Sequence, residues 1–589
     1  MRLRTIKQHL GIVVILAAFF ALGITYSVIT PLFEAPDELQ HYARIKRLAE
    51  AIGLVQLDPT VSQLAHQQRY QQPLYHLVGA LATFWDDAGD MRRLLWFNPH
   101  ADIGVAKADG NVNLLIHTRE ESFPYRRTSL GVHVLRFLSV LMGTGTVLIT
   151  YLIALEIFPQ RQYLALGAAA INAFIPQFLF ISGIVNNDNL VTLLCSLALL
   201  MMLRIFNIQY PISNHNWLLD IRYWVLGLVI GLATLTKVNA LGLLPLAALV
   251  IAINSCRQRS VKVFISSTTL LLATVSLVSG WRFVRNWQLY GDPTALQMFL
   301  NTLAPRHPQP TLRQLMAEWG DYSHSFWGLF GLGNVPLGAP VYRVLDILAL
   351  SGALGMLIFL VRAWRRRQLS KSARTVPTLS PAMERPRPDF VADPPLDGAG
   401  TPLDSDCSNG DARGKREYLS GGYLEEPLIK VLVLLAWLVI LFGSLTNWAI
   451  RILTSIGRFL FPAVSAISIL LFLGLSQFVP RRHTKVLTCL IGSLMFVIAA
   501  LTPFRYIAPA YAKPHLLSAQ EIEAIPNRLD ISFGGTMKLL GYDLSIPNIQ
   551  YPLSTNLKPG DSLTVTLYWQ SLAEMNQDYS TFVLSLIHI

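Results

Sequence analysis

The residues best suited to chemistry lie in a short acidic stretch that follows the first long apolar run. The segment Pro31-Leu-Phe-Glu-Ala-Pro-Asp-Glu-Leu-Gln-His-Tyr42 carries adjacent carboxylates at Asp37 and Glu38, with His41 one helical turn after Asp37. A positioned carboxylate can accept the proton of an attacking hydroxyl group. Asp37 and Glu38 are therefore our candidate catalytic residues.

The same stretch is also typical of an ordinary helix start. Pro36 suits the first turn of a helix, and acidic side chains are favoured at the positive end of the helix dipole. Apolar residues then recur at helical spacing and predict an amphipathic helix along the membrane surface: Leu39, Tyr42, Ile45, Ala49 and Ile52. On these residues alone, the helix start is the simpler interpretation.

Other polar residues stand at the ends of later apolar runs. Asp188, in Asn186-Asn-Asp188, is as consistent with a simple turn as with a functional residue. Lys237 interrupts an apolar stretch, where an ionisable group indicates a functional site unless it reaches the interface. Arg285 lies in the loop 281–342, and Arg458 lies at the start of the later apolar run 456–478. Together these cations suit an anionic lipid headgroup, with a carboxylate available as base.

The elements that position these residues are membrane helices. The chain has 589 residues, 52% of them hydrophobic and only 14% charged, and its apolar runs are long enough to cross a bilayer. We expect a mainly α, polytopic membrane protein with about eleven transmembrane helices. The predicted spans are 10–30, 131–157, 163–185, 189–206, 222–236, 238–254, 261–280, 343–363, 428–446, 456–478 and 485–504. No small-residue cleavage site precedes Pro31, so the first span is interpreted as a retained anchor.

Basic residues in the short loops predict the orientation. They cluster in alternate loops, which places the N-terminus in the cytosol and the candidate site and the C-terminus outside. The net charge of +12 is explained by these flanks, so we expect membrane lipids and no nucleic acid as partners. Of the four cysteines, two lie in apolar runs and two in predicted cytosolic segments, which disfavours a disulfide.

Two domains are expected, 1–505 in the membrane and 506–589 outside it. The first contains an outer loop at 31–130 and a Pro- and Ser-rich segment at 364–427, interpreted as a disordered cytosolic linker. Alternating apolar residues in Leu563–Trp569 predict a strand of a small β-sandwich. Because a sandwich usually needs about seven strands and only about four are found, we expect this domain to be truncated.

Several short motifs, in this order, resemble the GT-C superfamily of integral membrane glycosyltransferases. The resemblance is to the group of protein O-mannosyltransferases and the aminoarabinose transferase of lipid A, in bacterial form, and it covers about 10–505. The motifs are Pro36-Asp-Glu38 with His41, Gln72-Pro-Leu-Tyr75, Arg136-Phe-Leu-Ser-Val140, Asn186-Asn-Asp188, Leu235-Thr-Lys237, Arg285-Asn-Trp287 with Tyr290-Gly-Asp-Pro293, Ser325-Phe-Trp-Gly328 and Gly457-Arg-Phe459. One departure is Gln71-Gln-Pro73, where such proteins often have a second proline.

The resemblance implies an inverting sugar transfer from a polyprenyl-phosphate donor, outside the bacterial cytoplasmic membrane. Asp37 would accept the proton of the acceptor hydroxyl, and Glu38 would pair with a basic residue or orient the acceptor. The donor phosphate would be neutralised by Lys237, Arg285 and Arg458. His41, Tyr75 and Asp188 complete the predicted substrate-binding set. The acceptor, whether glycan, lipid or protein, stays open.

Two other functions remain possible on the sequence. A transporter or flippase for lipid-linked sugars could hold phosphate with the same cations, although no internal repeat is evident. The second of these functions is that of a noncatalytic envelope protein that displays the C-terminal domain. Asp37 and Asp188 could supply oxygen ligands to a divalent metal, but no strong metal-binding spacing is present and no metal is assigned.

Overall fold

The chain folds into two compact units, and each is described by itself. The computed structural model describes residues 2–54, 64, 67–99, 101, 103–104, 112–206, 221–303, 305–375, 410–452, 457–512, 516–545 and 564–573. The first unit is Met1–Tyr511 and the second is Ala512–Ile589.

Long apolar helices make the first unit a multi-pass membrane protein. Within the described residues, nine helical segments are long and apolar enough to cross a membrane, or ten if one bent pair counts as a span. The helices of this part are α1 (Arg2–Ile29), α6 (Arg127–Ile157), α7 (Gln162–Ala173), α8 (Pro176–Ser182), α9 (Asp188–Ile205), α10 (Ile221–Thr234), α11 (Leu243–Arg257), α12 (Val261–Val275), α13 (Trp281–Tyr290), α17 (Ala339–Thr375), α18 (Gly410–Arg451), α19 (Val464–Leu475), α20 (Thr484–Thr502) and α21 (Ala508–Ala510).

Every predicted span overlaps one or two of these helices, but the count of eleven is not confirmed. The predicted span 163–185 is the pair α7 and α8, bent by 65°. Pro176 opens α8, and a proline cannot continue the hydrogen-bonding of the preceding helix. The predicted span 222–236 is α10, whose 14 residues reach only about 21 Å, less than the roughly 30 Å of hydrocarbon.

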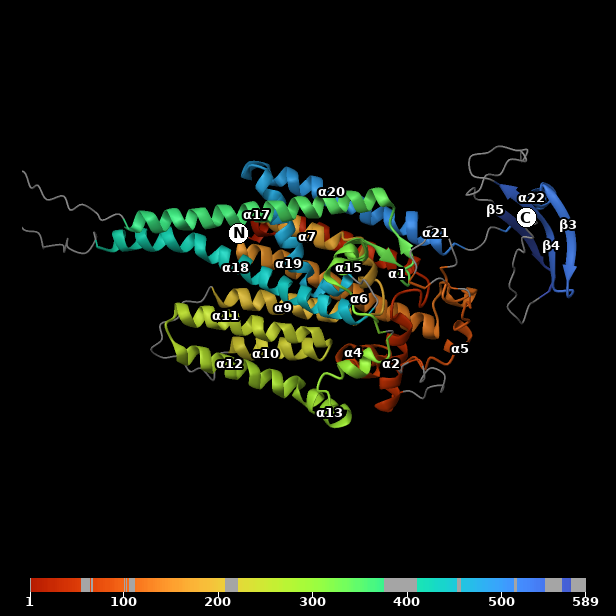
Figure 1. Cartoon of the computed structure of the whole chain (residues 1–589), viewed down its shortest axis with the longest axis horizontal. Helices are drawn as coiled ribbons and strands as arrows, with labels where there is room; N and C mark the ends of the chain where they lie inside the picture. The colour runs from red at the N-terminus through yellow and green to blue at the C-terminus, as the bar shows by residue number, and fades with distance from the viewer. Residues whose placement is uncertain are drawn as a thin grey trace, which may run out of the picture. The chain divides into compact units, whose positions relative to one another are not determined.

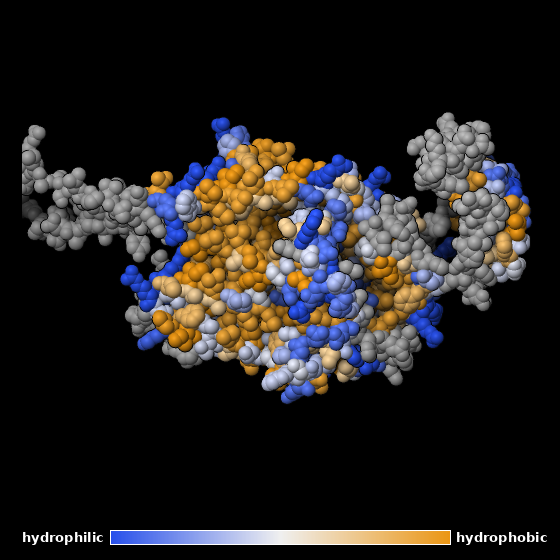
Figure 2. Space-filling view, viewed as in Figure 1, coloured by the Kyte–Doolittle hydropathy of each residue, from blue (hydrophilic) through white to orange (hydrophobic). Residues whose placement is uncertain are grey.

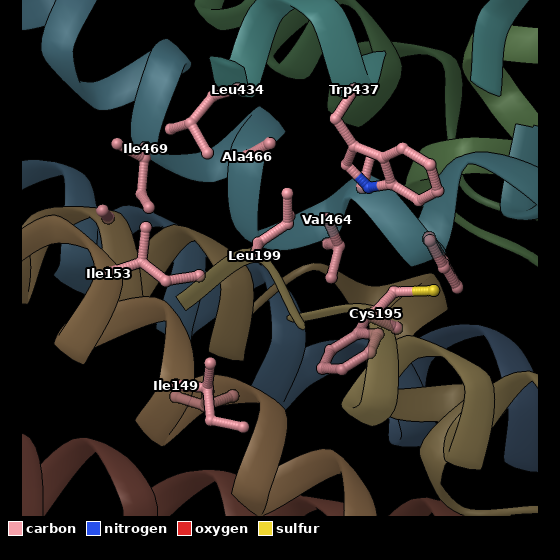
Figure 3. Close-up of a cluster of buried hydrophobic side chains, with 14 of the residues drawn as sticks. Ile149, Ile153, Cys195, Leu199, Leu434, Trp437, Val464, Ala466 and Ile469 are labelled. Atoms are coloured by element: carbon pink, nitrogen blue, oxygen red, sulfur yellow. The ribbon is translucent and has the colours of Figure 1, made fainter. Parts of the chain in front are cut away.

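The core of the bundle forms where α6, α9, α18 and α19 meet. Figure 3 shows Ile149 and Ile153 of α6 facing Cys195 and Leu199 of α9, with Trp437 of α18 close by. Trp437 is fully buried, and its indole nitrogen donates to the carbonyl oxygen of Pro462 at 3.0 Å. The outer surface of the long helices is broadly hydrophobic in Figure 2, as contact with lipid requires.

Short elements gather at one end of the long helices, where Figure 1 shows α2, α4, α5 and α13. They are α2 (Glu38–Ala51), α4 (Leu74–Ala82), α5 (Met91–Leu94), α14 (Leu296–Leu300), α15 (Leu312–Ala317), α16 (Trp319–Trp327), the 3-10 turns η1 (Gln67–Tyr70), η2 (Arg119–Glu121), η5 (Val238–Gly242) and η7 (Gly457–Ala463), and the antiparallel pair β1 (Leu329–Phe330) and β2 (Val335–Pro336).

Basic loops meet at the other end of the bundle. Burial lowers the pKa of Arg161, and the nearby charges of Arg481 and of Arg366 in the last turns of α17 lower it further, so these three arginines lie close together. The ammonium group of Lys485 also lies 5.9 Å from the ring of Tyr163. This clustering agrees with the predicted alternation of the loops. Which end is cytosolic stays a prediction.

The second unit contains α22 (Ala519–Glu523) and an antiparallel sheet in the order β3 (Asn527–Phe533), β4 (Met537–Ser545), β5 (Thr564–Ser571). A sandwich is not confirmed, because the described residues form one three-stranded sheet. In the first unit, α17 continues to Thr375 and α18 begins at Gly410, inside the segment predicted to be a linker. Residues 376–409 of that segment lie outside the described residues.

Candidate functional site

Asp37 stands at the start of α2 but does not cap it. The residue has φ 63°, and its side chain makes no capping hydrogen bond. Its carboxylate instead accepts a hydrogen bond from Nη2 of Arg458 at 2.7 Å, and the side chain is 48% exposed. A helix start therefore does not account for this carboxylate.

Arg458 reaches Asp37 from η7. The preceding Gly457 packs tightly on α16, because a Cβ there would approach the backbone nitrogen of Phe326 to 2.7 Å. The Gly457 amide also donates to the hydroxyl of Ser325 at 2.7 Å. The Arg458 side chain is only 6% exposed, and its Nε and Nη1 atoms are buried with no hydrogen-bond partner among the residues that the structure describes.

Lys237 and Asp188 form a second ion pair. Asp188 opens α9, and Lys237 follows α10 in an extended conformation. The Lys237 ammonium also lies 4.9 Å from the centre of the ring of Phe459, the residue that follows Arg458. Asn187 donates to the side chain of Gln71 at 2.7 Å, which ties the start of α9 to the first outer loop.

Glu38 differs from Asp37 in every respect that matters for catalysis. It is fully buried, and its carboxylate accepts from Nε and Nη2 of Arg136 at 2.8 and 2.6 Å. The backbone amides of Phe33 and Val185 donate to the same carboxylate at 3.1 and 3.0 Å. Pairing with a basic residue agrees with one of the two roles expected for Glu38. The expected catalytic role does not fit, because no part of the carboxylate is accessible.

The rings of His41 and Tyr75 pack edge to face. The centroid of the His41 ring lies 6.1 Å from that of Tyr75, and the Tyr75 hydroxyl lies 3.3 Å from the hydroxyl of Ser139. Nδ1 of His41 lies 3.0 Å from Nε2 of His76. Burial lowers the pKa of His41, and the charges of Lys237, Arg458 and Arg44 lower it further.

Arg285 belongs to a separate cluster of arginines. Burial, and then the charges of Arg282 and Arg285, lower the pKa of Arg44 to about 10. Arg282 is buried and donates to the carbonyl oxygen of Gln71 at 3.0 Å, while Arg285 is exposed. Within the described ranges, no carboxylate forms an ion pair with these three arginines. This arginine cluster (Arg44, Arg282 and Arg285) therefore lacks the counter-ion that Lys237 and Arg458 have.

A histidine clasp holds the loop that precedes Asp37. Nε2 of His117 lies 2.9 Å from Glu34, and Nδ1 lies 2.8 Å from Glu121. Glu34 also accepts from the amides of Leu114 and Leu115, both at 2.9 Å. Burial opposes the charge on His117, but the bonds to Glu121 and Glu34 outweigh it and raise its pKa to about 9. The clasp fixes Glu34 three residues before Asp37.

The structure thus joins most of the predicted site. Asp37 contacts Arg458, Asp188 contacts Lys237, and His41 lies within the influence of both cations. The described residues contain no cluster of three or more His, Cys, Asp or Glu side chains suited to a metal. Arg44, His76 and Arg282 are not among the site residues predicted from the sequence. Helical spacing could have revealed two of them, because Arg44 follows His41 by three residues and Arg282 precedes Arg285 by three.

One family model matches the chain. Residues 129–281 match the family described as dolichyl-phosphate-mannose-protein mannosyltransferase. The matched segment runs from α6 to the start of α13 and includes Arg136, Asp188 and Lys237. This match points to the GT-C superfamily of membrane glycosyltransferases, as expected from the motifs. No curated protein matches the sequence.

Several solved structures are similar in outline. The Archaeoglobus fulgidus oligosaccharyltransferase tethered with an acceptor peptide is 12% identical, with TM-score 0.41, over 88% of this chain and 57% of that one. ArnT from Cupriavidus metallidurans, bound to undecaprenyl phosphate, is 12% identical, with TM-score 0.36, over 85% of this chain and 73% of ArnT. The S. cerevisiae protein O-mannosyltransferase Pmt1-Pmt2 complex is 15% identical, with TM-score 0.30, over 48% and 34%. The chain thus spans about half of the oligosaccharyltransferase and a third of the yeast protein.

Proposed function

We propose that the chain transfers a sugar from a polyprenyl-phosphate donor to an acceptor hydroxyl on the outer side of the membrane. The observation that carries the proposal is a set of buried polar side-chain atoms, at the same end of the bundle as Asp37, that have no hydrogen-bond partner among the described residues. They are Nε of Arg44, Nε of Arg282, Nε and Nη1 of Arg458, and both amide atoms of Gln72. Leaving a buried donor unpaired costs about 1–3 kcal/mol, and more when it is charged, so such a concentration favours a polar ligand.

An anionic ligand suits these atoms best. Four of the six are guanidinium nitrogens, which bind phosphate oxygens through strong, charge-assisted hydrogen bonds. No described carboxylate pairs with the arginine cluster, so a phosphate would also relieve the repulsion among its members. The family match to a mannosyltransferase that uses a lipid phosphate is in keeping with this ligand.

The chemistry follows from the position of Asp37. The acceptor oxygen attacks the anomeric carbon, its proton passes to the Asp37 carboxylate, and the bond from that carbon to the phosphate oxygen breaks. The bonding electrons leave with the polyprenyl phosphate, whose charge the arginines and Lys237 stabilise. A single displacement of this kind inverts the anomeric carbon. Proton acceptance by a positioned base is worth about 10²–10⁴-fold in rate.

The test is transfer by purified protein in vesicles supplied with undecaprenyl-phosphate sugars and a panel of hydroxyl-bearing acceptors. Asp37→Asn is expected to lower the rate by about 10²–10⁴-fold without loss of stability. Asp87→Asn is the matched control, since Asp87 is an exposed acidic residue of the same outer loop whose carboxylate accepts from the Gly89 amide at 3.0 Å. Full transfer by Asp37→Asn would refute the base. Movement of the lipid across the bilayer without a new glycosidic bond would identify a flippase instead.

A further inference from the structure

Two histidines of the site form a buried, directly bonded pair. His41 of α2 and His76 of α4 are exposed by only 1% and 0%, and their rings lie 5.2 Å apart. Nδ1 of His41 lies 3.0 Å from Nε2 of His76, and Nδ1 of His76 lies 3.2 Å from the carbonyl oxygen of Gln72.

This chain of contacts determines where each proton lies. A carbonyl oxygen only accepts, so Nδ1 of His76 must carry a hydrogen and donate it to Gln72. In a neutral imidazole the other nitrogen then has a lone pair, so Nε2 of His76 accepts. His41 must therefore donate through Nδ1, which leaves an unprotonated lone pair on its Nε2 atom. No described residue is bonded to that atom.

The surroundings keep His41 neutral. Burial and the charges of Lys237, Arg458 and Arg44 all oppose protonation of this ring. His76 is disfavoured as a cation for similar reasons, because it is buried and lies close to His41 and Arg44. His41 Nε2 is thus a neutral acceptor placed among cations that suit a phosphate.

Such an acceptor selects for one kind of ligand group. A lone pair repels a phosphate oxygen, which has only lone pairs to offer, but it accepts a hydrogen bond from a hydroxyl group. In a lipid-phosphate sugar, the hydroxyl groups nearest the phosphate belong to the sugar. We propose that His41 Nε2 binds a hydroxyl of the donor sugar beside its phosphate, and that His76 is the positioning residue that holds His41 in the required tautomer. This inference rests on the proposed function and deepens it.

The variants separate the two histidines. His41→Asn keeps an amide donor near the position of Nδ1 and removes Nε2. His76→Gln keeps an acceptor near the position of Nε2, whereas His76→Leu removes it. We expect His41→Asn and His76→Leu to weaken binding of undecaprenyl-phosphate mannose about five- to tenfold, the value of one hydrogen bond, and His76→Gln to retain it. Binding of sugar-free undecaprenyl phosphate should be unchanged in all three.

The ligand-free protein gives a second measurement. In the full chain labelled with ¹⁵N-histidine and held in lipid nanodiscs, His41 should show a protonated Nδ1 and an unprotonated Nε2 from pH 6 to 8. The His41→Asn spectrum identifies its signals, and His76→Leu should change the tautomer. A charged His41, a proton on Nε2, or equal losses of both lipids in His41→Asn would overturn the inference. Failure of the wild-type protein to bind undecaprenyl phosphate would instead refute the proposed function, since the tautomer would still be measurable.

Discussion

Replacing Arg136 by methionine tests the division of labour between the two adjacent acids. Arg136 is fully buried and uses all five of its N–H groups: two bind Glu38, and the others bind the carbonyl oxygens of Ser27, Thr30 and Pro31. Methionine fills similar space but leaves the Glu38 carboxylate buried with only two amide donors. Breaking a buried ion pair in this way costs about 3–5 kcal/mol.

The assay is the free energy of unfolding in one detergent, with transfer measured on the same samples below the transition. Arg136→Met should lose about 3–5 kcal/mol, and the double variant Arg136→Met/Glu38→Gln should recover part of that loss because the buried charge is gone. Asp37→Asn serves as the contrast, since it should lose transfer and keep its stability. If Arg136→Met kept wild-type stability and lost transfer as Asp37→Asn does, Glu38 and Arg136 would be catalytic and the reasoning wrong.

Three further predictions follow from other contacts. Because the pKa of His117 is raised from 6.5 to about 9, the clasp should stabilise the folded protein by up to about 3 kcal/mol below pH 6.5, and this stabilisation should be lost as the pH rises through 9. Thermal unfolding measured from pH 6 to 10 checks this, and His117→Gln should flatten the dependence of the unfolding temperature on pH. Trp437→Ala should cost about 3–5 kcal/mol through the cavity it leaves, whereas the same change at the exposed Trp364 should not, by the same unfolding assay. Arg282→Gln should weaken undecaprenyl phosphate binding by about tenfold, as measured by titration, and an unchanged affinity would remove the arginine cluster from the phosphate site.

The membrane helices could be predicted closely because hydrophobic length alone determines them. The predicted span 131–157 is α6 at Arg127–Ile157, and the predicted span 456–478 corresponds to the helical segment Gly457–Phe478. The errors in the count arise where length and continuity disagree, as at the bend before Pro176 and in the short α10. A run of apolar residues indicates burial in lipid or protein, but not whether a helix is broken inside it.

The residues of the candidate site could be predicted from the sequence, but the ion pairs that they form could not. Sequence order and sidedness brought Asp37, Lys237 and Arg458 to one end, yet Arg458 is 421 residues from the carboxylate that it contacts. From the residues alone, Asp37 and Glu38 are both candidate catalytic carboxylates, because nothing local distinguishes two adjacent acids; the family resemblance was needed to give them different roles. Their difference arises from α6, which supplies Arg136 to one of them, and that is a tertiary contact.

The left-handed backbone at Asp37 restricts which amino acids could ever serve at this position. A φ of 63° is adopted readily by glycine and with modest strain by asparagine and aspartate, but it is unfavourable for most other residues. Glutamate would bring the same functional group but on a longer side chain that lacks this tolerance. The turn therefore makes aspartate the acid that fits this position with the least strain. Engineered variants with asparagine or glycine at position 37 should keep their stability, although they lose the carboxylate, whereas glutamate should lower the stability.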